Sequence, residues 1–86
     1  MTARAPILSA EDELTDQLIL QAAFKKTGLP NPLVFLQDGQ EAVDYLAGRP
    51  PYADRGAHPL PGLLLLDLKM PRMDGFDVLT WLAGQP

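Results

Sequence analysis

Apolar residues are concentrated in three short runs along the chain. Residues 6–10, 33–36 and 63–66 are wholly or almost wholly apolar, and acidic or turn-forming residues follow each run. A run of about four to eight apolar residues bounded by turn signals is typical of a buried strand. The pattern therefore predicts three short strands, of which the last is an unbroken run of leucines.

Between and after these runs, apolar residues recur at the spacing of an amphipathic helix. Leu14, Leu18 and Ala22 are each four residues apart, and this segment ends in two lysines followed by Gly28. Cations offset the helix dipole at its carboxyl end, and glycine is common just beyond that end. Similar spacing follows the second and third apolar runs. Helices are therefore predicted over residues 14–27, 42–47 and 76–83.

The order of elements, in which a strand is followed by a helix three times, predicts an α/β protein. Short apolar strands that alternate with helices pair in parallel, and helices then cover both faces of the sheet. We expect a flavodoxin-like doubly wound sheet with strand order 2-1-3 in residues 6–86, after an N-terminal tail of residues 1–5. Residues 49–61 hold four prolines and one glycine, so a long irregular loop is expected there.

Composition narrows the classes of function. The chain has 86 residues, of which 47% are hydrophobic, and this suits one small domain. No segment approaches the ~18 apolar residues of a membrane span, and no secretory signal is recognisable, so a cytoplasmic location without membrane contact is expected. The chain has no cysteine for a disulfide or thiolate metal site, and its formal charge of −4 disfavours nucleic acid and favours cations as partners.

Two acidic groups are expected to meet at the carboxyl ends of the strands. Asp12 follows the first strand and Asp67 the third, and these strands are neighbours in the order 2-1-3. An isolated aspartate at a strand end is usually only a polar boundary residue, but two that lie close together repel and call for a cation. Mg²⁺ prefers oxygen ligands and leaves room for phosphate. Held by its buried strand, Asp67 also suits nucleophilic attack on a phosphoryl group, which forms an acyl phosphate.

These residues resemble those of a known family. Residues 7–16 (ILSAEDELTD) and 63–75 (LLLLDLKMPRMDG) closely resemble the receiver domain of two-component response regulators. The resemblance implies that Asp67 is the phosphoacceptor, that Asp12 contacts Mg²⁺ directly and that Glu11 is its partner acid. The Mg²⁺ ligands that the resemblance implies are Glu11, Asp12, Asp67 and the backbone carbonyl of Lys69.

By the same resemblance, the chain accepts phosphate from a histidine kinase or a phosphotransfer protein and acts as a signalling module rather than as an enzyme. The loop at residues 48–61 and the segments before it are further similar to single-domain receivers associated with phytochrome-like histidine kinases. A phosphohydrolase of the haloacid-dehalogenase type also uses an aspartate after a hydrophobic strand. That class needs a second aspartate two positions later, where this chain has Lys69.

The chain also departs from the family pattern. Receiver domains have a fourth and a fifth strand, which carry a hydroxyl residue that senses the phosphate and a lysine that pairs with it. The sequence is therefore expected to be a C-terminally truncated receiver that lacks these strands and their helices. An alternative function is an interaction fragment that no longer switches. An unpaired third strand and uncovered helix faces invite association, so a homo-oligomer or a domain-exchanged dimer is expected.

Overall fold

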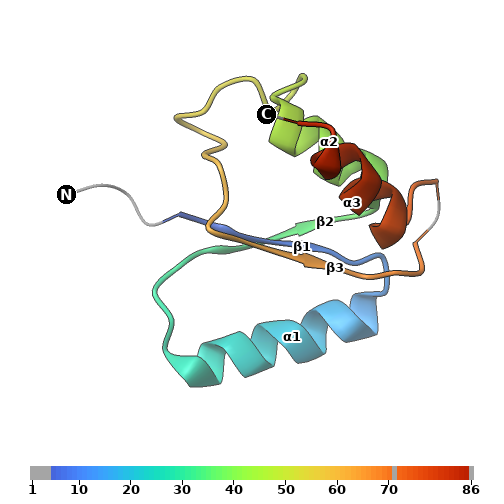
Figure 1. The fold of residues 1–86 in the computed structure, drawn as a ribbon. Coiled ribbons are helices and arrows are strands. Elements are labelled where there is room, and N and C mark those ends of the chain that lie inside the picture. Colours follow the sequence, from blue (N-terminus) through green and yellow to red (C-terminus); the bar gives the residue numbers. More distant parts are fainter. Residues whose placement is uncertain (1–4, 71, 86) are drawn as a thin grey trace.

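The three predicted strands form one parallel sheet (Figure 1). A computed structural model describes residues 5–70 and 72–85 of the chain. The strands are β1 (Ile7–Ala10), β2 (Leu33–Leu36) and β3 (Leu63–Leu66). β1 lies in the middle and pairs with β2 on one side and β3 on the other, so the predicted strand order 2-1-3 is confirmed. All three strands start and end at the same level, which brings their carboxyl ends side by side.

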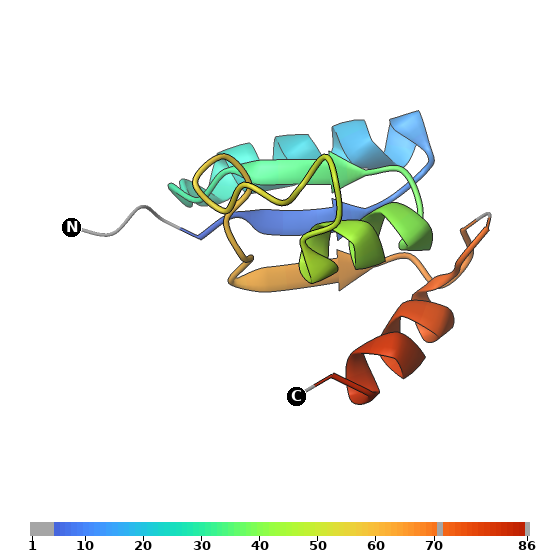
Figure 2. The same ribbon diagram turned by 90° about the horizontal axis from the view of Figure 1, so that it is seen from above.

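The helices lie in two layers, one on each side of the sheet. Figures 1 and 2 show α1 along one face and α2 with α3 on the other. The helices are α1 (Leu14–Thr27), α2 (Gly39–Ala47) and α3 (Gly75–Ala83). α2 begins three residues before the predicted start, because the Asp38 side chain accepts a hydrogen bond from the Glu41 N–H and caps the helix there. No helix in the described ranges has the length and apolarity needed to cross a membrane.

The hydrophobic core lies on the side of the sheet that α2 and α3 cover. Leu8 of β1 and Val78 of α3 are completely buried there. Every residue of α1, by contrast, is exposed or half-buried, and Leu14 and Ile19 are 67% and 62% exposed. The core residues are Leu8, Ala10, Leu36, Ala42, Val43, Tyr45, Met70 and Val78. The predicted helix at α1 is confirmed, but it adds far less to the core than its four-residue spacing suggests.

The predicted irregular loop at residues 49–61 is confirmed, and aromatic and arginine side chains pack it against α2. The Tyr45 hydroxyl donates to the Pro59 carbonyl at 2.8 Å, and the Tyr45 ring lies 5.9 Å from that of His58. Arg55 donates to the Tyr45 and Leu46 carbonyls at the end of α2. The loop lies at the amino ends of the strands, as the Gly62 N–H bond to the Pro6 carbonyl shows. The opposite end of the sheet is therefore free of this loop.

The predicted N-terminal tail of residues 1–5 lies outside the described residues except for Ala5. The Ala5 carbonyl accepts a hydrogen bond of 2.9 Å from the Asn31 side chain. The boundary between tail and domain stays a prediction.

Candidate functional site

Backbone hydrogen bonds carry the sheet one residue beyond the ends of β1 and β3. The Glu11 N–H donates to the Leu36 carbonyl at 2.9 Å, and the Asp67 N–H donates to the Ala10 carbonyl at 3.1 Å. Glu11 and Asp67 are therefore fixed to the rigid sheet although both lie just outside the strands. Their side chains emerge at the carboxyl ends, where ligands bind in open parallel sheets.

Three carboxylates meet at this edge. Glu11, Asp12 and Asp67 each offer an oxygen, and these oxygens lie within 4.8 Å of one another. All three residues are half-buried. Asp12 Oδ1 is buried and finds no hydrogen-bond partner among the described residues. A buried carboxylate oxygen without a donor is costly, so this atom calls for a cation or another electrophilic partner. The donor set, with oxygen atoms only, is the one that hard divalent cations prefer.

The electrostatics of the cluster agree with its geometry. Burial raises the pKa of Glu11 above its ordinary value, and the charges of Asp67 and Asp16 raise it further. The Glu13 N–H, which donates to Glu11 Oε2 at 3.1 Å, acts in the opposite direction. The deprotonated cluster is therefore under strain from its own charge, and a cation among the three carboxylates would remove that strain.

The loop after Asp67 folds back on that residue. The Lys69 N–H donates to Asp67 Oδ1 at 3.0 Å, which orients the carboxylate. A methyl group placed on Gly75 would lie 2.7 Å from the Asp67 carbonyl oxygen, so only glycine allows α3 to begin this close. The structure thus places Lys69 next to Asp67, while the role of its carbonyl as a metal ligand stays a prediction.

Gln17 is a residue of the site that the sequence pattern did not indicate. Its side-chain amide donates to the Glu11 carbonyl at 2.6 Å and so ties the first turn of α1 to the acidic loop. A glutamine on the polar side of a helix carries no signal of such a contact. The contact becomes visible only when the path of the loop between β1 and α1 is known.

No protein family model matches the chain, but curated proteins and solved structures do. It is 35% identical over 74 residues to the probable methanogenesis regulatory protein FilR2 of Methanothrix harundinacea, a match that covers 86% of this chain and 45% of FilR2. It is 34% identical over 80 residues to the response regulator Rcp1 of Synechocystis, covering 93% of this chain and 52% of Rcp1. The chain therefore spans about half the length of the curated relatives it matches.

Solved structures of response regulators are also similar to this chain. The bacteriophytochrome response regulator AtBRR superposes with a TM-score of 0.88 at 38% identity, over 98% of this chain and 59% of that one. The Mn²⁺-bound form of Rcp1 superposes with a TM-score of 0.84 at 33% identity, over 95% of this chain and 57% of that one. The predicted resemblance to response regulator receivers, including those of phytochrome systems, is confirmed in sequence and in fold.

Proposed function

We propose that this chain, a receiver domain of the response-regulator type, accepts a phosphoryl group on Asp67 in a two-component phosphorelay. The donor is the phosphohistidine of a histidine kinase or a phosphotransfer protein. In the transfer, a carboxylate oxygen of Asp67 forms a bond to phosphorus as the bond between phosphorus and the imidazole nitrogen breaks. The product is an acyl phosphate, and the histidine leaves as the neutral side chain after it takes up a proton.

The observation that carries this proposal is the cluster of Glu11, Asp12 and Asp67, in which Asp12 Oδ1 has no hydrogen-bond partner in residues 5–70 and 72–85. We propose that these carboxylates, together with the Lys69 carbonyl, hold Mg²⁺. The Mn²⁺-bound form of the relative Rcp1 supports a divalent ion at this kind of site. Bound there, the ion supplies positive charge that offsets both the carboxylates and the incoming phosphoryl oxygens.

The chain's own residues then position the nucleophile. The Asp67 N–H bond to Ala10 fixes the backbone, and the Lys69 N–H bond to Oδ1 sets the rotation of the carboxylate. Transfer to a carboxylate needs mainly such positioning and neutralisation of charge. The altered charge at Asp67 would be read by a protein partner, in keeping with a role as a signalling module rather than an enzyme.

Acetyl phosphate, or beryllofluoride as a stable mimic, tests the proposal directly. We expect an adduct on Asp67 that mass spectrometry locates, that requires Mg²⁺ and that Asp67→Asn abolishes. Asp54→Asn is the matched control, because Asp54 is also a loop aspartate that accepts a backbone N–H but lies in the loop at the other end of the sheet. An adduct that persists in Asp67→Asn, or that forms equally well in chelator, would refute the assignment.

A second candidate function, association with another copy of the chain, is favoured by the exposed apolar side chains of the helices. Leu14, Leu18 and Ile19 of α1 and Phe76 and Leu79 of α3 are each about half exposed or more. Burying such groups between chains removes apolar surface from water. Light scattering should then show a dimer or larger species whose population rises with protein concentration, and a monomer at all concentrations would exclude this function.

A further inference from the structure

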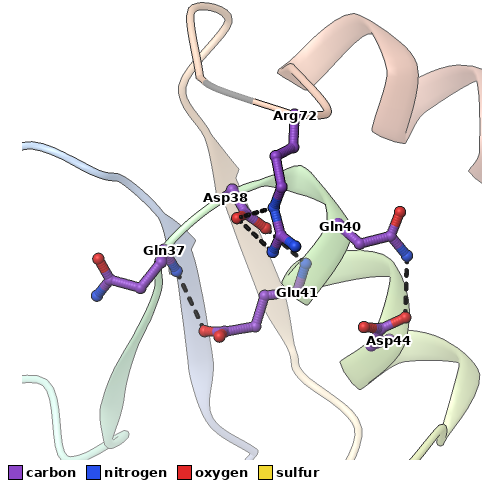
Figure 3. A network of polar contacts seen from close by, with 6 residues as sticks. All are labelled: Gln37, Asp38, Gln40, Glu41, Asp44 and Arg72. Carbon is purple, nitrogen blue, oxygen red and sulfur yellow. Dashed lines mark hydrogen bonds and ion pairs between the residues drawn. The ribbon is translucent and has the colours of Figure 1, made fainter.

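The loop that follows Asp67 is held at its far end by the amino terminus of α2. Figure 3 shows the contact: Arg72 reaches across to Asp38, the residue that precedes α2. Arg72 Nε donates to Asp38 Oδ2 at 2.7 Å, and Arg72 Nη2 lies 2.5 Å from the same oxygen. Beside this ion pair, the Gly39 N–H donates to the Met73 carbonyl at 2.8 Å. The loop and the helix start are thus joined by a side-chain and a backbone contact.

Asp38 is a rigid anchor for this contact. Its side chain is only 9% exposed, and Oδ1 accepts the Glu41 N–H at 2.8 Å while Oδ2 accepts from Arg72. The Glu41 side chain in turn accepts the Gln37 N–H at 3.1 Å, just before Asp38 (Figure 3). Both oxygens of Asp38 are therefore engaged, and the helix cap fixes the carboxylate that receives the arginine.

Arg72 adopts a backbone conformation that favours glycine. Its φ is +64°, in the left-handed region, which is unfavourable for a residue with a Cβ atom. A glycine would adopt this conformation without strain. The arginine must therefore be explained by what its side chain does, and the only partner that the described residues give it is Asp38.

A displacement at Arg72 would reach Asp67, because residues close to Arg72 on each side along the chain contact Asp67. Three residues before Arg72, the Lys69 N–H binds Asp67 Oδ1. Three residues after it, Gly75 lies against the Asp67 carbonyl. The described residues on both sides of Arg72 therefore contact Asp67, and the contact with Asp38 ties Arg72 to α2.

We propose that Arg72 is a positioning residue, which acts through Asp38 to hold the loop after Asp67 in the conformation that binds the metal and receives the phosphoryl group. This inference rests on the proposed function, because the metal that the loop would help to bind is part of that proposal. It adds a residue to the site that touches neither the carboxylates nor the phosphoryl group. The ion pair ties the amino terminus of α2 to the Asp67 loop, so a change at one is transmitted to the other.

Substitutions at Arg72 distinguish the effect of its ion pair from the effect of its strained backbone conformation. Arg72→Gly removes the ion pair and also relieves the strain, so its unfolding temperature should stay close to that of the wild type. We expect its affinity for Mn²⁺, measured by calorimetry, to fall by about three- to tenfold, since Arg72 is 64% exposed and the pair is partly screened. The Lys69 amide, followed by NMR, should exchange with solvent faster by a similar factor. Arg72→Lys should restore part of both losses.

Asp38→Asn provides the partner test, because the amide oxygen can still cap α2 while the charge is lost. We expect it to weaken Mn²⁺ binding as Arg72→Gly does, and the double variant to be no weaker than either single variant. Arg49→Gly is the matched control: Arg49 makes an exposed ion pair with Asp44 near the other end of α2. It should leave both the affinity and the exchange of the Lys69 amide unchanged.

The outcomes distinguish this inference from the function on which it rests. Wild-type affinity for Mn²⁺ and wild-type exchange at Lys69 in Arg72→Gly would overturn the role of Arg72. Losses that simply follow a fall in unfolding temperature would also overturn it, because they would show a structural role alone. If the wild type binds no Mn²⁺, the proposed function fails, and the exchange of the Lys69 amide still decides whether Arg72 positions the loop.

Discussion

Gly39 lies where the start of α2 touches the loop after Asp67, and Gly39→Ala should loosen that contact. A methyl group at this position would lie 1.9 Å from the Met73 carbonyl oxygen and 2.9 Å from Val78 Cγ2. Met73 O is a backbone atom, so no side-chain rotation relieves the overlap. The helix start and the loop would have to separate by about 1 Å, because such contacts are almost never closer than 3.0 Å.

The expected cost is about 2 kcal/mol. Overpacking a close contact typically costs ~1–3 kcal/mol, and loss of the hydrogen bond from the Gly39 N–H to Met73 adds about 1 kcal/mol. Alanine in place of glycine at the first position of a helix returns at most about 1 kcal/mol. For a domain of this size, whose total stability is ~4–13 kcal/mol, such a loss is large.

Urea unfolding followed by Trp81 fluorescence and circular dichroism measures this loss. With a slope of about 1 kcal/mol per molar urea for a small domain, the midpoint should fall by ~2 M. Gly84→Ala is the control, since a methyl group there would meet its nearest atom, the Trp81 carbonyl oxygen, at an ordinary 3.5 Å. If Gly39→Ala unfolds at the wild-type midpoint, the contact between loop and helix is not as rigid as the distances indicate.

Three further predictions concern charge, the long loop and the third helix. Without metal, the proton on Glu11 stabilises the folded state, because the folded state holds that proton more tightly than the unfolded chain does. This contribution should be fully present below the ordinary pKa of 4.5 and be lost as pH rises through the raised pKa of Glu11. Thermal unfolding in chelator tests this, and Asp67→Asn should make the stability of the fold depend less on pH. Tyr45→Phe leaves the Pro59 carbonyl without its donor and should cost about 1 kcal/mol, with faster amide exchange confined to residues 49–61. Asp74→Ala removes the side-chain acceptor of the α3 capping box, to which the Asp77 N–H donates, and leaves the backbone N–H at position 74 that donates to Asp77 Oδ2. It should cost ~1 kcal/mol in urea unfolding, whereas an unchanged midpoint would show that the side-chain cap contributes nothing.

The apolar pattern predicted where the elements lie, because apolar runs and their periodicity are local signals. Its prediction that the third strand is buried was wrong, since Leu63 is 49% exposed and the other three leucines are half-buried. The run of leucines at 63–66 predicted β3 at the position that it has in the structure. Gly28 likewise predicted the end of α1. The meeting of Asp12 with Asp67 also followed from the sequence, once the order 2-1-3 made their strands neighbours. Each of these inferences needed only the positions of residues along the chain.

The contacts that fix the loops could not be predicted in this way. The pair of Arg72 with Asp38 depends on a left-handed backbone angle and on two loops that meet in space. The bond from Gln17 to Glu11 depends on the path of the acidic loop. Likewise, the spacing of apolar residues in α1 predicted a buried helix face, but no residue of α1 is buried. How much of a helix is buried depends on which other parts of the fold pack against it.

The position of β3 at the edge of the sheet links the site to the folding reaction. Asp12 and Asp67 are more than fifty positions apart, and they meet only when β3 docks against β1. That step carries a large loop-closure entropy and brings like charges together, so both terms slow it. A cation held by the three carboxylates would oppose the second term. The ion proposed to support phosphoryl transfer would therefore also favour the folded chain, in which β3 is paired with β1, over the chain in which β3 is undocked.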